Sequence, residues 1–401
     1  MMATKKNGGL NRRRFLQLGS AAAITPWLSA CSFDWGKPVD SSLLLSGYRD
    51  APLHSTRSPH RYGVAGIHTS GELAFDLSVP QRVHDSLYLP NSQQALFFAR
   101  RPGTHLYVID LVSGEMTQTI STPSQRHFYG HGCISRDGRY LLTTENAYDR
   151  QLGCIGVYDT TDNFRRIDEF ASGGIGPHQI RFLSDQKTIV VANGGILTHP
   201  SRGRKKLNLE NMQPSLTYID SGSGQLLDDF KLPHHQQSIR HIDVSDSDQV
   251  AVGIQFEGDL TQQLPLAYTH SGEQELQALN ASMQDWQRHQ QYIGSVCMNS
   301  TGTRLLLSSP RGGIVSGWNL QTRTLESIQT QRDGAGLAFT AQEANFFVSN
   351  GIGQISSLGS QNFSSNAQSP LYFKRRSWDN HMSVAQLPSS IDAPHQNSQA
   401  G

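Results

Sequence analysis

The chain contains a repeated unit, and a histidine recurs at the same place in most of its copies. The short hydrophobic runs that carry it open with His84, His131, His178, His241 and His381. Two further runs fit the same frame but have Ser295 and Gly336 at that place, which makes seven units. Self-similarity at a period of about 20–50 residues is typical of solenoids and propellers. We therefore predict seven copies of one small unit, in which each histidine opens a strand.

Each unit divides into four short runs of alternating apolar and polar residues. In the second unit the expected strands are residues 132–135, 140–145, 154–159 and 166–170. The spacing is 47 residues from His84 to His131 and again from His131 to His178. Four short antiparallel strands per unit, joined by tight turns, indicate the blades of a β-propeller.

The two ends of the chain complement each other. Segment 380–387 supplies only a first strand, whereas segments 43–48, 62–68 and 72–79 supply three strands that lack a first one. We therefore expect an all-β, seven-bladed β-propeller over residues 43–391, closed by pairing of the N- and C-terminal strands in one blade. Such closure leaves no unpaired edge within the ring. Residues 392–401 are polar and without pattern, and we expect a disordered tail.

The first thirty residues have the character of an export leader and do not belong to the fold. The segment around Arg12 and Arg13 resembles a twin-arginine motif, and the apolar stretch 18–28 after it is too short to span a bilayer. Residues 28–31 (LSAC) resemble a lipoprotein processing box. We expect a twin-arginine lipoprotein signal peptide at 1–30 and a linker at 31–42 that is lipidated on Cys31. The alternative is a plain signal peptide followed by a chance cysteine.

This leader predicts a periplasmic domain that is anchored to a membrane by lipid. Several lipid chains on one terminus hold a protein stably at a membrane surface. Ser32 is not the aspartate that retains lipoproteins at the inner membrane, so the outer membrane is favoured. The formal net charge of +1 is that of an ordinary soluble domain and argues against a nucleic-acid partner.

Three cysteines remain beyond the leader: Cys133, Cys154 and Cys297. Cys133 and Cys154 fall on the first and third strands of one unit, about 10 Å apart at about 4.8 Å per strand step. A disulfide tolerates a Cα separation of about 7 Å at most. We therefore expect three buried thiols.

One stretch of the third unit carries a family resemblance. Residues 177–185 (PHQIRFLSD) and 189–193 (IVVAN) resemble the strand pair of the YVTN and lactonase-like seven-bladed propellers. With the leader and the seven-unit layout, the chain is similar over residues 40 to 390 to a family of uncharacterised bacterial exported propeller proteins. The resemblance implies genes for imelysin-type and di-haem cytochrome-like proteins nearby, in clusters thought to serve iron acquisition. It implies context and brings no catalytic residue with it.

Polar residues should gather at the end of the propeller where the histidines lie. First strands line the axis of a propeller, and the loops between second and third strands reach the same face. Beside the five histidines, we expect that face to display Arg100, Arg101, Glu145, Asn193, Glu257, Arg311 and Asn350. The loop at 194–214 is unusually long and carries Arg202, Arg204, Lys205 and Lys206. Long loops of compact domains are often functional, so we interpret this one as a lid or docking element, with a solvated insertion as the alternative.

The ring of histidines has three interpretations. Neutral imidazole is a common ligand of Fe, Cu and Zn, and histidine rings hold copper clusters in other propeller families. Against a metal, the ligands here would come from separate strands around a wide channel. The second interpretation is an anionic or polar ligand held by His and Arg, with Glu145 and Glu257 as counter-charges. The third is structural, because duplication copies residues without regard to function.

The main alternative to a binding protein is an enzyme. The chain has no Gly-x-Ser-x-Gly elbow, HExxH, phosphate loop or CxxCH motif. Lactonase chemistry would need a carboxylate beside a divalent ion, for which Glu145 with His131 is the best available pair. We predict a binding protein that assists iron or other metal acquisition beside periplasmic metal-uptake proteins. The alternative is a lactonase-like hydrolase or metal-dependent oxidoreductase that uses the same funnel.

Overall fold

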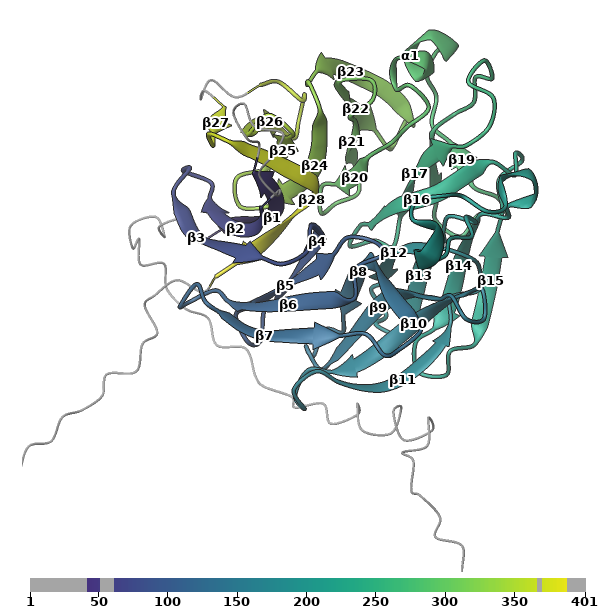
Figure 1. Ribbon diagram of the computed structural model, residues 1–401. Coiled ribbons are helices and arrows are strands. Elements are labelled where there is room, and N and C mark those ends of the chain that lie inside the picture. Colours follow the sequence, from purple (N-terminus) through teal and green to yellow (C-terminus); the bar gives the residue numbers. More distant parts are fainter. Residues whose placement is uncertain (1–41, 51–60, 366–369, 388–401) are drawn as a thin grey trace, which may run out of the picture.

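The computed structural model describes residues 42–50, 61–365 and 370–387. These residues form seven four-stranded antiparallel sheets set around a central axis (Figure 1). The prediction of an all-β, seven-bladed β-propeller is therefore confirmed. We number the blades along the chain from the one that carries His84, so that the blade holding both chain ends is blade 7.

The strands of each blade follow in order from the axis outward. Blade 1 consists of β4 (Val83–Leu89), β5 (Gln94–Ala99), β6 (His105–Asp110) and β7 (Met116–Ser121). Blade 2 consists of β8 (Arg126–Ile134), β9 (Tyr140–Ala147), β10 (Leu152–Asp159) and β11 (Arg165–Ala171). Blade 3 consists of β12 (Pro177–Phe182), β13 (Thr188–Asn193), β14 (Ser215–Asp220) and β15 (Leu226–Phe230). Blade 4 consists of β16 (Gln237–Val244), β17 (Val250–Phe256), β18 (Ala267–His270) and β19 (Gln277–Ala278).

The remaining blades follow the same plan. Blade 5 consists of β20 (Ser295–Met298), β21 (Arg304–Ser309), β22 (Ile314–Asn319) and β23 (Thr324–Thr330). Blade 6 consists of β24 (Gly334–Thr340), β25 (Asn345–Asn350), β26 (Gln354–Gly359) and β27 (Leu371–Tyr372). Blade 7 consists of β28 (Arg376–Gln386), β1 (Ser42–Asp50), β2 (Tyr62–His68) and β3 (Leu73–Val79). The α-helix α1 (Met283–Arg288) precedes blade 5, and two 3-10 turns, Pro200–Arg202 and Leu209–Asn211, lie in the long loop of blade 3.

The ring closes where the sequence predicted. β28 pairs antiparallel with β1, with Leu44 opposite Val384. This pairing makes the two ends of the chain neighbours in one sheet, in which β28 is the innermost strand and β1, β2 and β3 follow it outward. The N- and C-terminal strands therefore close blade 7, as expected.

The hydrophobic core lies between neighbouring blades. Successive side chains of a strand point to opposite faces of its sheet. On β5, Ala95 and Phe97 accordingly pack against blade 7, whereas Leu96 and Phe98 pack against blade 2. Similar clusters occupy the other blade interfaces, so the alternation seen in the sequence buries both faces of each sheet.

The inner strands differ from the prediction in where they begin. His84 and His178 are each the second residue of their strand, close to the expected start. In β8, β16 and β28 the strand starts several residues before the histidine, which lies inside the strand. The residues ahead of the histidine pair with the second strand, and the strand continues through a break in register.

Several expectations concern residues outside the described part of the chain. Arg12, Arg13 and Cys31, the leader 1–30, all but the last residue of the linker 31–42, and the tail 392–401 lie there. Within the described ranges, no helix has the length and apolar character needed to cross a bilayer. Cys133 lies on β8 and Cys154 on β10, and both are buried free thiols, as is Cys297.

Candidate functional site

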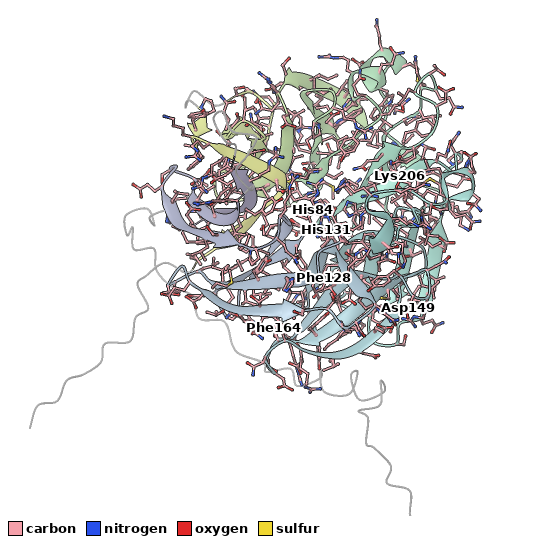
Figure 2. All side chains as sticks on the ribbon, in the orientation of Figure 1. His84, Phe128, His131, Asp149, Phe164 and Lys206 are labelled. Carbon is pink, nitrogen blue, oxygen red and sulfur yellow. The ribbon has the colours of Figure 1, made fainter. Side chains whose placement is uncertain are left out.

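The five repeated histidines meet at the centre of the propeller. Figure 2 places His84 and His131 close together near the axis. Ring centroids of neighbouring imidazoles in the cluster lie 4.7–6.1 Å apart, and His131 and His381 face each other across the ring at 4.7 Å. The sequence predicted this convergence, but it predicted a wide channel. The rings are instead in contact, so the objection that separate strands cannot form a compact ligand set does not hold. We call His84, His131, His178, His241 and His381 the histidine cluster.

Breaks in β-register place these side chains. His84 and His178 are extra residues of their strands, between Val83 and Asp85 and between Pro177 and Gln179. His131 and His381 lie in similar irregular stretches of β8 and β28. A bulge bends its strand and re-aims a side chain, here toward the axis. β20, which carries Ser295 at the equivalent place, pairs without such a break.

Blades 5 and 6, which lack the repeated histidine, also contact the histidine cluster. Ser295 Oγ lies 3.3 Å from Nδ1 of His381 and fixes the orientation of that ring. A Cβ atom on Gly336 would lie 2.4 Å from Ser349 Oγ and 3.1 Å from the His381 carbonyl carbon. Blade 6 therefore has no room for a sixth ring at this place.

A carboxylate orients His131, the member of the cluster that contacts all the others. Nδ1 of His131 lies 2.7 Å from Oδ2 of the buried Asp85. Burial alone would raise the pKa of Asp85, but His131 outweighs it and lowers that pKa to about 2. Because an ionised carboxylate only accepts hydrogen bonds, Nδ1 of His131 carries the proton and Nε2 carries a free lone pair. Metal-binding histidines are commonly held in this way by a carboxylate on the other ring nitrogen.

Each ring of the histidine cluster keeps one buried nitrogen without a hydrogen-bond partner among the described residues. These atoms are Nδ1 of His84, His178 and His241 and Nε2 of His131 and His381. Buried polar atoms are nearly always bonded. Two other buried histidines follow that rule, since both ring nitrogens of His127 and of His289 have partners. The histidine cluster is thus built differently from the structural histidines of the same chain.

Burial keeps the cluster uncharged at neutral pH. It lowers the pKa of His381 to about 3, and those of His84, His178 and His241 well below the usual 6.5. For His131, burial outweighs the opposing effect of Asp85, and the pKa is again lowered. A neutral imidazole offers one lone pair, which is the form that binds metal ions.

The ring nitrogens of the histidine cluster form two overlapping triads. One ring nitrogen from each of His84, His131 and His381 lies within 4.8 Å of the others, and the same holds for His131, His178 and His241. Three imidazoles are a common ligand set for Zn, and imidazole also suits Cu and Fe. The arrangement can therefore hold a metal ion, or two ions that share His131.

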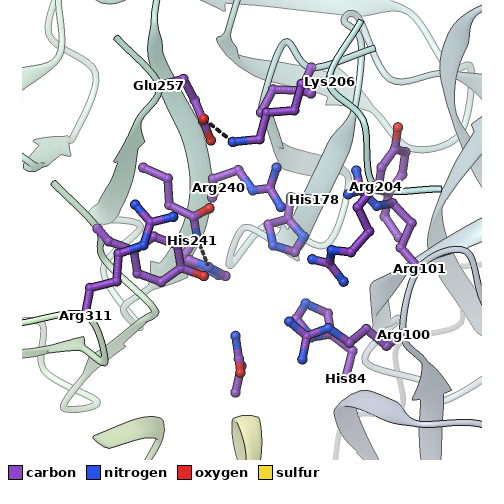
Figure 3. Close-up of a pocket in the computed structure, with 15 residues that line it drawn as sticks. His84, Arg100, Arg101, His178, Arg204, Lys206, Arg240, His241, Glu257 and Arg311 are labelled. Atoms are coloured by element: carbon purple, nitrogen blue, oxygen red, sulfur yellow. Dashed lines mark hydrogen bonds and ion pairs between the residues drawn. The ribbon is translucent and has the colours of Figure 1, made fainter. Parts of the chain in front are cut away.

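A positively charged cavity of about 150 Å³ opens directly outside the cluster (Figure 3). His84, His178 and His241 form part of its wall. Four of the predicted supporting residues also line it: Arg100, Arg101, Glu257 and Arg311. The long loop of blade 3 contributes Arg204 and Lys206, so the segment interpreted as a lid does reach the site.

Glu145, Asn193 and Asn350 do not line this cavity. Asn193 bonds to Ser172 and Thr217, and Asn350 holds the turn after its own strand. These residues stabilise their own blades.

The expected pair of Glu145 with His131 is wrong. The Glu145 carboxylate accepts hydrogen bonds from Thr143 and Tyr158 at 2.8 Å each and pairs with Arg166 at 2.8 Å. Alternation along β9 explains this, because Thr144 turns inward to the carbonyl oxygens of His131 and His178 while Glu145 points to the other face.

Several residues of the site were not among the predicted site residues, and they include Asp85, Tyr129, Arg240 and Tyr292. Arg240 directly precedes His241, and neighbours in a regular strand point to opposite faces. The break in register between Ile239 and His241 lets both line the cavity. Asp85 follows His84 directly, and a carboxylate next to a repeated histidine was a usable signal.

Comparison with protein families supports one assignment. Residues 77–385 match the model of a protein family of unknown function, DUF1513. The chain belongs to this family. A search of curated proteins finds no match. Among solved structures, the crystal structure of RRP9 WD40 repeats superposes with a TM-score of 0.58 at 10% identity, covering 77% of this chain and 85% of that one. At that identity the likeness concerns the propeller fold alone.

Proposed function

We propose that this member of DUF1513 is a metal-binding propeller that uses the histidine cluster as its ligand set. One observation carries the proposal: five buried imidazoles converge while each keeps a nitrogen without a partner. A buried ring nitrogen without a hydrogen bond costs free energy, and coordination of a metal ion by that nitrogen removes the cost. A purely structural cluster gains nothing from this arrangement.

The donor set favours a borderline metal. Imidazole nitrogens suit Zn, Cu and Fe, whereas Mg and Ca prefer oxygen ligands. Asp85 supplies the carboxylate behind His131, and Ser295 holds His381. Bound in a triad, the ion would meet three neutral nitrogens and would keep its remaining positions for a ligand from the cavity.

The wider role that we propose is accessory to iron or other metal acquisition in the periplasm. The leader that resembles a twin-arginine lipoprotein signal supports export and a lipid anchor on Cys31. The resemblance to exported propellers associated with imelysin-type proteins supports metal-uptake partners. A hydrolase that uses Glu145 has lost its support, because that carboxylate is occupied within blade 2.

Metal titration of the chelator-stripped protein tests the proposal. Zn²⁺, Cu²⁺ and Fe²⁺ are added separately, and heat and stoichiometry are recorded for the unaltered chain, for His131→Ala and for the control His289→Ala. We expect saturable binding that His131→Ala weakens at least tenfold and His289→Ala leaves unchanged. Thermal unfolding of each variant verifies that it is folded. The proposal fails if no metal binds, or if His131→Ala binds as well as the unaltered chain.

A further inference from the structure

The cavity outside the histidine cluster is lined by far more positive than negative charge. Its cationic residues come from four separate segments of the chain, and Figure 3 shows them around one common space. They are Arg100, Arg101, Arg204, Lys206, Arg240 and Arg311, while Glu257 is the acidic residue of the wall.

Acidic partners account for only two of these six cations. Lys206 pairs with Glu257, and Arg100 pairs at 3.1 Å with Asp379, which also pairs with Arg82 at 2.5 Å. No carboxylate among the described residues pairs with the other four, which are Arg101, Arg204, Arg240 and Arg311. The cavity therefore carries an uncompensated positive charge.

Part of this positive charge is buried. Arg240 projects from the bulge beside His241, and its Nε is buried without a hydrogen-bond partner. Burial lowers the pKa of Arg101 below its usual value, and the nearby positive charge of Arg240 lowers it further, which reflects the cost of holding dehydrated guanidinium groups near one another. Arg311 is held over the ring of Tyr292 at 4.3 Å, which keeps it at the mouth of the cavity. Partly buried like charges are stable when an anion neutralises them.

We propose that this cavity binds a small multivalent oxyanion, with carboxylate or phosphate oxygens received by Arg101, Arg204 and Arg240. Guanidinium groups match such oxygens with paired, charge-assisted hydrogen bonds. A volume of about 150 Å³ suits a small molecule. The anion site needs the arginines alone, and its residues differ from the proposed metal ligands.

The two sites adjoin, because His84, His178 and His241 line the same cavity. When a metal ion occupies the histidine cluster, an oxyanion in the cavity faces the free coordination positions of that ion. This part of the inference rests on the proposed function. It identifies the cargo as a metal ion together with its oxyanion, such as a carboxylate chelate, in place of a bare ion.

Calorimetric titration of the metal-free chain tests the anion site separately from the metal site. The probes are inorganic phosphate and citrate, each at low and at high salt in a buffer without oxyanions. We expect at least one of them to bind, more weakly at high salt. Arg101→Gln and Arg240→Gln should each weaken binding at least tenfold. Arg202→Gln removes the same charge from the same long loop but outside the cavity, and it should leave binding unchanged.

Each outcome either supports or overturns the proposed anion site. Citrate binding alone assigns the site to carboxylates, phosphate binding alone to phosphate groups, and both support the proposal when the cavity arginines are required. Arg204→Gln, on the exposed rim, replaces Arg240→Gln should the latter fail to fold. The proposal is overturned if neither probe binds, or if binding survives Arg101→Gln together with either other cavity variant. Because no metal is present, failure of the metal proposal does not change this result.

Discussion

Two buried polar clusters of this propeller are built in opposite ways. In blade 2, the carboxylate of Glu145 is surrounded by donors from Thr143, Tyr158 and Arg166. On the axis, each ring of the histidine cluster keeps one nitrogen without a partner. Burial is nearly complete in both places, so burial alone does not separate a structural cluster from a binding site. Hydrogen-bond satisfaction does, because selection for stability leaves few buried groups unbonded.

The largest effect should come from removing the hydrogen-bonded carboxylate of Glu145. Glu145→Ala leaves Tyr158 without its acceptor and leaves the partly buried Arg166 paired with Glu169 alone, and we expect the free energy of unfolding to fall by about 3 kcal/mol. Metal content should remain that of the unaltered chain, since Glu145 does not reach the cavity. Urea unfolding and elemental analysis of the same sample check both statements. Loss of metal at unchanged stability would reverse the contrast between the two clusters.

The next effect concerns the support of the histidine cluster. Asp85→Asn removes the charge behind His131, and changes to such partners typically weaken metal binding about 10- to 100-fold. Asp243→Asn is the matched control, because Asp243 also lies on an inner strand but bonds to the backbone of Met298 at 2.7 Å. Calorimetric titration with Zn²⁺ compares them. Equal affinities for the two variants would rule out a role for the Asp85 carboxylate in orienting the ligand.

Acid should destabilise the metal-free protein. The pKa of His381 is lowered to about 3 and that of His289 to about 4, both by burial. The unfolded chain takes up protons near pH 6.5 that these folded sites do not. The stability that these two neutral rings contribute is therefore present above about pH 6.5 and is lost as the pH falls toward 4. Thermal unfolding midpoints measured from pH 7.5 to 4 should decline, and a flat profile would show that these rings are not held neutral by burial.

The smallest effect is a gain in stability. His178→Leu replaces a ring that keeps an unbonded nitrogen, and we expect the metal-free protein to become more stable by about 1 kcal/mol. His289→Leu should do the reverse, because it breaks hydrogen bonds to the carbonyl oxygen of Asp285 and to Ser316 at 2.9 Å each. Urea unfolding of both variants, stripped of metal, measures the difference. Destabilisation of similar size in both would mean that the cluster is as structural as His289.

The sequence alone could predict the architecture and the meeting of the histidines. Repeat periodicity fixed the blades, and residues equivalent in a closed ring must gather around its axis. Aligning the seven repeats was therefore sufficient to predict that His131 and His381 lie close together, although they are far apart along the chain.

The direction of individual side chains could not be predicted in the same way. Simple alternation places Arg240 and His241 on opposite faces, but a bulge brings both into the cavity. Glu145 follows the alternation of β9, but its partners Tyr158 on β10 and Arg166 on β11 come from contacts that no local pattern specifies. Bulges and long-range partners, which the sequence does not mark, decide the chemistry of this face.

Elemental analysis of the folded domain tests the central claim most directly. The protein is purified without chelator and without an affinity tag that carries metal, beside a variant with both His131→Ala and His178→Ala. These changes remove residues from both triads. The account predicts near-stoichiometric iron, copper or zinc in the unaltered protein and its loss from the variant. Absence of metal from both samples, even after reconstitution with each ion, would contradict it.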